Sequence, residues 1–511
     1  MNVSSELSRQ FQAIWNRASN TYVRQEITSA LVEKWATAFG IHDAIVEESS
    51  VGRFVAIPVV VLRTGDTRAI FPKVPYRKDS AWQSRRLAMD AQAALWAKAE
   101  WFSPLWVGMA DASKLLRDIR QASGERAIKL FHYHTSTLYT VPFQAVCIAQ
   151  ILSQAPSLKE LVPLAREAYL AFYSGHRASS IAALIPALEG GLSRILPHAG
   201  TDPLFVRIDR IFDKAIDTAS EWHFEMRGED RTWVPREYLT CDYLFSQDEV
   251  VFALETYRRW LKTSFFADTE RYDGPTALNR HMFAHNTHLS WQQSSNFERL
   301  VVALATLGFV ESWYDGTHAI SPFFPKMNED SKLLWQQALL RGNLQGAVKR
   351  IEEKHYHESG RLVPELPTDD GVLLRKAVLV QECMRDLVRP LRDAGWSIEV
   401  GDPDDRALFM IVRARAVDRR LKVALLYSCA TANTLYQELA ETCDAILYVG
   451  APYNQSQYAY NISVHVGPVL GWQPPRASGR RKPIWKIGEC LLRALRAVFR
   501  SMPRRTTSER H

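Results

Sequence analysis

The spacing of hydrophobic positions changes twice along the chain, and these changes divide it into regions of different structure. Between about 155 and 320, apolar residues recur every three to four positions, the period of helices that bury one face. Pro and Gly stand between these segments, as expected at helix ends. The pattern predicts an all-helical bundle over 155–320. The expected helices cover residues 157–174, 177–196, 203–220, 246–266, 276–286 and 292–313.

The first 150 residues mix helical spacing with short apolar runs that alternate with turn residues. Residues 53–63 and 68–74 read as strands joined by a tight turn, which predicts a hairpin. Pro58 and Pro72 favour edge positions in the sheet, because proline cannot donate to the ladder. The pattern predicts a mixed α/β domain over residues 1–150.

Beyond the bundle, residues 321–365 read as a helical connector that ends in a proline-rich, acidic linker. A helix at 373–394 and about five short apolar runs then predict a small α/β domain over 372–472. The runs cover 396–400, 407–414, 421–427, 445–449 and 462–466, with a helix at 432–441. The sequence therefore predicts an α+β multidomain protein: a mixed N-terminal α/β region, a central all-α helical bundle and a small C-terminal α/β domain.

The tail at 476–511 differs from the rest of the chain in charge. It holds 11 Lys and Arg against 2 Asp and Glu, a balance of +9, whereas the remaining residues carry −2. From Lys482 to Met502, apolar residues recur at steps of three and four, which predicts a basic amphipathic helix. Its polar side carries Lys486, Arg493, Arg496 and Arg500. Three alternatives stay open for this helix: docking on the protein's own body, contact with nucleic-acid phosphates, and contact with an anionic membrane surface.

Bulk composition limits the classes of protein to which the chain can belong. A hydrophobic content of 47% with 23% charged residues is typical of folded domains. The polar N-terminus and the lack of a long apolar run argue against a signal peptide or membrane span, so we expect a cytoplasmic protein. The six cysteines form no Cys-x-x-Cys pair, and no glycine-rich phosphate loop occurs. We therefore expect no metal and no cofactor.

The segment Leu278–Asn286 carries the most informative chemistry of the chain. It contains Arg280 followed five positions later by His285, near the start of an expected helix. Metal-independent RNA cleavage needs these two residue types, because a histidine moves a proton near neutral pH and an arginine stabilises the phosphorane. The spacing alone is not specific, since Arg350 and His355 share it within a charged helical run that reads as a solvated face.

The surroundings of Arg280 resemble a known family. Tyr173–Arg177 and the helix Ile181–Leu192 precede an Asn-Arg-His-x-x-x-His motif at 279–285. This arrangement is similar to that of bacterial HEPN-like proteins (higher eukaryotes and prokaryotes nucleotide-binding), and it covers roughly a third of the chain. One position departs from the pattern, because relatives often carry Gly after the final His, where this chain has Asn286.

The resemblance implies an endoribonuclease in which two helical domains face each other and their motifs share one cleft. Arg280 would then clamp the phosphate and its transition state, and His285 would be the general acid or base. Asn279 and His281 would be polar supports, and Glu189 would orient groups in the same cleft. The ribose 2′-hydroxyl would be the nucleophile, leaving a 2′,3′-cyclic phosphate and a 5′-hydroxyl without a metal.

The same resemblance implies RNA as the partner and a homodimer as the active form, because one chain supplies one convincing motif. In bacteria such proteins often serve as regulated toxins or antiphage-defence effectors, whose flanking domains sense a trigger. The alternative is a non-catalytic HEPN-like protein that binds RNA or nucleotides, or that only dimerises.

Two further groups of residues have weaker chemical interpretations. Asp402–Asp405 lies before Lys422, which allows a metal-dependent nuclease of restriction type. The required Glu-x-Lys on one strand is absent, however, and a surface turn is the simpler hypothesis. His132 and His134 alternate as on one face of a strand, but no third metal ligand is nearby, so we expect a pair of surface histidines.

Overall fold

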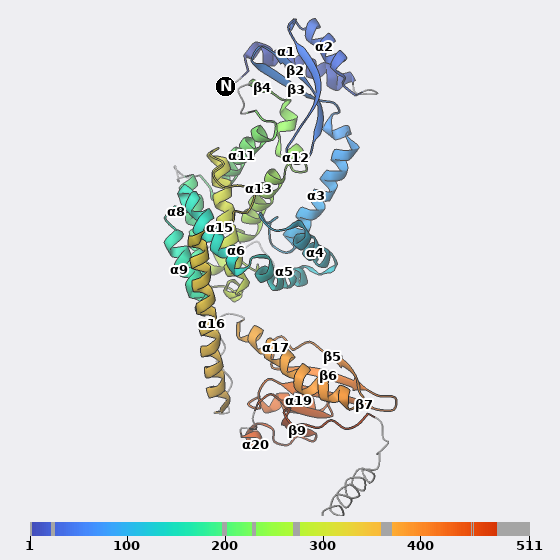
Figure 1. The fold of residues 1–511 in the computed structure, drawn as a ribbon, viewed down its shortest axis with the longest axis vertical. Helices are drawn as coiled ribbons and strands as arrows, with labels where there is room; N and C mark the ends of the chain where they lie inside the picture. Colours follow the sequence, from blue (N-terminus) through green and yellow to red (C-terminus); the bar gives the residue numbers. More distant parts are fainter. Residues whose placement is uncertain are drawn as a thin grey trace, which may run out of the picture. The chain divides into compact units, whose positions relative to one another are not determined.

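The computed structural model describes residues 3–21, 26–196, 202–226, 231–268, 276–358, 370–450, 452 and 454–477. Its contacts separate two compact units, one formed up to Val348 and the other mainly from Asp370 onward. Helices predominate in the described residues, and each unit contains one small sheet (Figure 1). The chain is therefore a mixed α+β protein, as its sequence predicts.

The first unit begins with a four-stranded sheet flanked by two helices, α1 (Ser5–Thr21) and α2 (Ser29–Ala38). Across the sheet the strands follow the order β1 (Ile45–Val51), β2 (Ile57–Thr64), β3 (Thr67–Pro72) and β4 (Arg231–Trp233). The antiparallel pairing of β2 with β3 confirms the predicted hairpin. The edge positions expected for Pro58 and Pro72 are wrong, because both strands are inner ones. The prolines lie instead close to strand ends, where a missing N–H interrupts least of the ladder.

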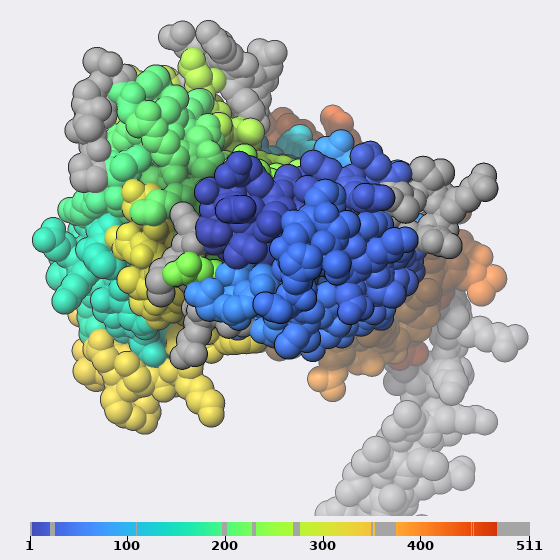
Figure 2. All heavy atoms as spheres, turned by 90° about the horizontal axis from the view of Figure 1, so that it is seen from above, coloured from blue at the N-terminus to red at the C-terminus, as the bar shows by residue number. Residues whose placement is uncertain are grey.

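The N-terminal sheet is tied to a segment far along the chain. β4 pairs parallel to β3. Beside it, Trp15 donates its indole N–H to Glu237 at 2.6 Å, and the backbone N–H of Tyr76 donates to the Tyr238 hydroxyl at 3.1 Å. Seen from above, the N-terminal residues form a continuous face that adjoins the helices coloured green (Figure 2). The sheet therefore packs on the helical part of the same unit.

Between β3 and the helical bundle the chain forms helices. They are η1 (Tyr76–Lys78), α3 (Ser80–Lys98), α4 (Met109–Gln121), α5 (Gly124–Leu138), α6 (Val141–Val146), the π turn η2 (Cys147–Ile151), α7 (Leu152–Gln154) and α8 (Pro156–Lys159). The strand expected for His132 and His134 is wrong, because both residues lie on α5, where positions two apart point to different faces. His132 is hydrogen-bonded through Nδ1 to Ser295, whereas the His134 ring packs on Tyr133.

The helices predicted between 157 and 313 are confirmed. They are α9 (Val162–Tyr173), α10 (Arg177–Ile195), α11 (Leu204–His223), α13 (Glu249–Trp260), α14 (Arg280–His285) and α15 (Ser295–Tyr314), followed by the long α16 (Glu329–Glu358). Shorter elements lie between them: η3 (Arg236–Leu239), α12 (Cys241–Leu244), the π turn η4 (Leu261–Phe265) and η6 (Leu289–Gln292).

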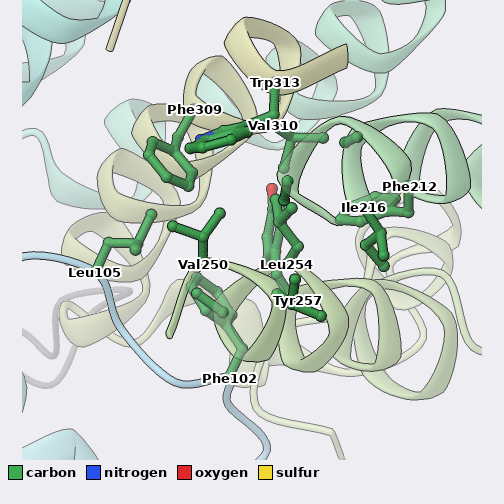
Figure 3. Packing of buried hydrophobic residues seen from close by; sticks show 14 of the residues in the cluster. Phe102, Leu105, Phe212, Ile216, Val250, Leu254, Tyr257, Phe309, Val310 and Trp313 are labelled. Atoms are coloured by element: carbon green, nitrogen blue, oxygen red, sulfur yellow. The ribbon is translucent and has the colours of Figure 1, made fainter. Parts of the chain in front are cut away.

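The helix α15 lies at the centre of this region, since every residue from Ser295 to Trp313 is buried. A helix enclosed on all sides must be apolar around its whole circumference, and α15 is nearly so. Phe309 and Val310 of α15 face Val250 of α13 in the packed core (Figure 3). α10 also approaches α15 closely at Gly191, where an added Cβ would lie only 2.8 Å from Leu307.

The second unit holds the small α/β domain. The α17 helix (Asp370–Glu382), the π turn η7 (Cys383–Val388) and α18 (Arg389–Asp393) precede a sheet whose five strands pair in chain order. The elements are β5 (Ser397–Val400), β6 (Phe409–Arg415), β7 (Arg420–Leu426), α19 (Asn433–Ala440), β8 (Ala445–Tyr448), α20 (Gln455–Tyr458) and β9 (His465–Pro468). β5 to β7 are antiparallel, and β7 to β9 are parallel. The five predicted strands are confirmed.

The acidic run Asp402–Asp405 lies in the connection between β5 and β6. Asp404 accepts hydrogen bonds from the backbone N–H groups of Leu408 at 2.6 Å and Phe409 at 2.8 Å. A carboxylate that closes its own turn in this way has a local structural role. The contacts favour the turn interpretation over the restriction-type nuclease.

The basic tail residues Lys486, Arg493, Arg496 and Arg500 lie outside the described residues. Among the helices that are described, none combines the length and the apolar character that a membrane crossing requires. Nowhere in the described ranges do three or more His, Cys, Asp or Glu side chains gather in a way that could hold a metal ion.

Candidate functional site

The candidate site is built on α14, a helix of only six residues that depends on Asn279 for its start. The Asn279 side chain accepts a hydrogen bond from the backbone N–H of Met282 at 2.9 Å, which caps the helix. Its amide donates to the backbone carbonyls of Ser264 at 2.8 Å and Ala267 at 3.0 Å. Asn279 is 1% exposed, so it fixes the position of α14 from beneath and does not face solvent.

Asn286 ends α14 in the left-handed conformation, with φ 50° and ψ 36°. Glycine adopts this conformation most readily, and asparagine is among the few other residues that tolerate it. The following N–H, that of Thr287, donates to the Met282 carbonyl at 3.1 Å and closes the turn. The departure of this chain from the family pattern therefore preserves the backbone conformation that the glycine of relatives would permit.

The loops on both sides of α14 are held by a second buried asparagine. Asn296, at the start of α15, donates to the carbonyls of Ala277 at 2.7 Å, Ser290 at 3.0 Å and Trp291 at 3.2 Å. The N–H of Ala277 donates in turn to the carboxylate of Glu100 at 2.7 Å. These bonds anchor a surface helix that is too short to be stable by itself.

Arg280 projects from α14 towards α10 and pairs with Glu189. The Arg280 Nε lies 2.8 Å from one carboxylate oxygen, and Nη2 lies 3.4 Å from the other. The two side chains are 40% and 36% exposed, so the pair sits at the surface. Among the described residues Glu189 uses only Nε and Nη2 of the guanidinium, which leaves the N–H groups of Nη1 for another acceptor. A surface guanidinium oriented in this way can still bind a phosphate.

His281 and His285 lie one turn apart on α14, and their rings are in contact. The ring centroids are 4.4 Å apart, at an interplanar angle of 50°. His281 is half-buried and His285 is exposed, so solvent or a substrate can reach the pair. Two adjacent imidazoles supply both a proton acceptor and a proton donor near neutral pH.

The directions of Arg280 and His285 decide what one copy of the site can do. Five residues along an ideal helix correspond to a rotation of about 140°. Arg280 is directed to α10, whereas His285 belongs to the exposed side of α14. One copy therefore presents the arginine and the histidine on different faces of the helix.

Beneath the site lies a buried polar centre around Arg299 of α15. Arg299 is 0% exposed, with its guanidinium over the rings of Phe131 at 4.6 Å and Trp101 at 5.4 Å. Burial lowers the pKa of Arg299 to about 10. Burial, together with the charge of Arg299, holds the pKa of His132 well below its usual range. His132 is thus neutral and structural, and it does not belong to the surface set.

The structure brings together some of the residues that the sequence indicates. Arg280 meets Glu189, and His281 meets His285, while Asn279 supports them from below. The sequence gave no sign of the anchoring residues Glu100 and Asn296, because a polar residue that binds backbone carbonyls leaves no periodic pattern.

The second pair with the same spacing, Arg350 and His355, lies on the long helix α16 and has no place in the α14 site. Arg280 and His285 are distinguished from it by their helix cap, their paired Glu189 and their histidine neighbour. Comparisons of the chain with protein-family models, with curated proteins and with solved structures found no match.

Proposed function

We propose that this protein is a metal-independent endoribonuclease of the HEPN type. The proposal rests on the surface set of Arg280, held by Glu189, beside the paired rings of His281 and His285. The set contains the two chemical functions that RNA cleavage needs: a cation for the phosphate and groups that transfer protons near neutral pH.

In the proposed reaction, His285 removes the proton of the ribose 2′-hydroxyl, and that oxygen attacks the adjacent phosphorus. The 5′ oxygen of the next nucleotide leaves and takes a proton from a second imidazole. Arg280 donates from Nη1 to a non-bridging oxygen as negative charge develops on the phosphorane. The products are a 2′,3′-cyclic phosphate and a 5′-hydroxyl.

We propose further that the active form is a homodimer. Arg280 and His285 lie about 140° apart around α14, so a single copy does not direct both at one phosphate. A two-fold arrangement of the helical regions would supply the arginine of one copy and the histidine of the other. A regulated toxin or antiphage-defence effector is the setting in which we expect such a nuclease.

The alternative function is RNA or nucleotide binding without cleavage, or dimerisation alone. One observation favours it: the charge of Arg280 is already compensated by Glu189, which weakens its pull on a developing phosphorane. The same pairing orients the guanidinium and leaves Nη1 open, which favours catalysis. The two functions differ in what a cleavage assay shows.

The test incubates the purified full chain with an end-labelled single-stranded RNA in EDTA and identifies the new ends. We expect cyclic phosphate and 5′-hydroxyl ends, and a loss of about 100-fold or more in rate for Arg280→Ala and for His285→Ala. His42→Ala removes an exposed histidine outside the site and serves as the control. Cleavage that requires Mg²⁺ and leaves 5′-phosphates would contradict the proposal. RNA binding that depends on Arg280 without any cleavage would establish the alternative.

Mixing the two inactive variants tests the dimer. If arginine and histidine act across two copies, a mixture of Arg280→Ala and His285→Ala should regain part of the wild-type rate, because mixed dimers contain one intact pair. A mixture as inactive as its components, or an active monomer in sedimentation, would rule out the shared site.

A further inference from the structure

A cavity of about 550 Å³ lies within the first unit, away from α14. It is enclosed by α3, the segment 103–108, the start of α13 with the residues before it, and the segment 322–324. Its walls are mainly apolar and aromatic, and they include Phe245, Phe252 and Trp106. This volume and this lining are typical of sites for small molecules, which occupy roughly 300–1,000 Å³.

Two polar atoms in the walls of the cavity are buried without partners. Gln247 is 1% exposed, and its side-chain carbonyl oxygen accepts no hydrogen bond. The Nε of Arg85 is likewise buried and donates to no acceptor. Buried polar atoms are nearly always hydrogen-bonded in folded proteins, so an acceptor and a donor lacking partners in one cavity point to a ligand.

The other charged groups of the wall are already engaged or directed away. Asp248 caps α13 through the N–H groups of Val250 and Val251, and its second oxygen lies 2.8 Å from Nδ1 of buried His223. Glu249 is exposed. Arg85 and Gln247 therefore determine which polar groups a ligand in this cavity needs.

The aromatic walls are fixed before any ligand arrives. Trp106 donates its indole N–H to the Ser321 carbonyl at 3.0 Å, which joins two of the enclosing segments. Phe324 stacks on Phe143 with ring centroids 4.4 Å apart and planes within 3°. Phe323, also part of the lining, is 77% exposed, an unusual position for a phenylalanine without a partner. Fixed aromatic walls lower the entropic cost of binding a flat ligand.

We propose that this cavity binds a small aromatic molecule that carries an N–H donor and an anionic group. The N–H donates to the carbonyl oxygen of Gln247, the anion accepts from Arg85, and the rings lie among Phe245, Phe252 and Trp106. The site is independent of the proposed nuclease, since none of its lining residues belongs to the α14 set. It gives the first unit a place to recognise a metabolite or signal of this chemistry.

The probe for the test is 8-anilinonaphthalene-1-sulfonate, which has fused aromatic rings, one N–H and one sulfonate. Fluorescence titration of the full chain should show one saturable site. Ala88→Trp, which fills the cavity from α3, should weaken binding at least tenfold. Leu87→Trp is the matched control, because Leu87 is the neighbouring residue on α3, is 72% exposed and does not line the cavity. Binding that is unchanged in Ala88→Trp, or equally reduced in Leu87→Trp, overturns the proposal.

Two further variants keep the test decisive if Ala88→Trp does not fold. Gln247→Leu removes the unpartnered acceptor, so it should raise the thermal midpoint of the free protein while weakening probe binding. A structural role for Gln247 predicts a lower midpoint instead. Arg85→Gln should weaken binding and abolish its dependence on salt. Probe affinity that is indifferent to both changes would place the dye elsewhere on the protein and refute the site.

Discussion

The position of α14 depends on one side chain, and the substitution Asn279→Ala tests this dependence. The change removes the N-cap, which contributes about 1 kcal/mol. It also removes two hydrogen bonds to the carbonyls of Ser264 and Ala267, each contributing about 1 kcal/mol. Because Asn279 is 1% exposed, water cannot readily replace these bonds. We expect the free energy of unfolding to fall by about 3 kcal/mol.

Urea unfolding followed by tryptophan fluorescence measures this loss, with Thr287→Ala, an exposed neighbour, as the control. Asn279→Asp gives the sharpest comparison. Asp and Asn are nearly equivalent at ordinary N-caps. Here the second carboxylate oxygen would face two carbonyls, so Asn279→Asp should not restore stability. A loss below about 1 kcal/mol for alanine, or full stability with aspartate, would refute the anchoring role of Asn279.

Three other substitutions have definite expected outcomes. Asn286→Gly should leave stability unchanged or raise it slightly in thermal unfolding, because φ is 50° there, and a clear loss would contradict that conformation. Gly191→Ala should cost about 1–3 kcal/mol in urea unfolding, because its Cβ would lie 2.7 Å from Leu158, whereas Gly190→Ala meets nothing within 4 Å and should be neutral or stabilising; equal effects would disprove the close packing. Burial raises the pKa of Glu311, so the protonated form is favoured in the folded state and this carboxyl's contribution to stability is lost as the pH rises through its folded pKa. Glu311→Gln should remove that part of the pH dependence in unfolding measured from acidic to neutral pH, and an unchanged profile would show that another group causes it.

The sequence predicts the helices and the C-terminal strands well because their apolar positions have a clear period and their ends carry Pro or Gly. It misses β1, whose residues Glu47 to Ser50 are exposed and polar, so alternation is absent. It misses β4 because three residues pair with a strand far away in the chain. His132 and His134 were misplaced because local alternation of aromatic and β-branched residues suggested a strand, whereas packing makes the segment helical.

The chemical residues of the site follow the same division. The Arg-x4-His spacing and its resemblance lead to Arg280 and His285, since those depend on residue type and order. The contact of Arg280 with Glu189 spans 91 positions and depends on how α10 and α14 meet. The supports provided by Asn296 and Glu100 depend on tertiary structure alone, because each binds backbone atoms of a loop that carries no pattern of its own.

The pairing of β4 with β3 has a consequence for the order of events during synthesis. β3 ends at Pro72, and its outer partner begins only at Arg231, about 160 residues later. At roughly 5–20 residues per second, a ribosome needs on the order of 10–30 s to supply that partner. Throughout this interval the growing chain presents an open strand edge to its surroundings, the kind of surface that aggregation and chaperones recognise. The nascent protein therefore has a vulnerable period that ends when β4 is made and the sheet closes.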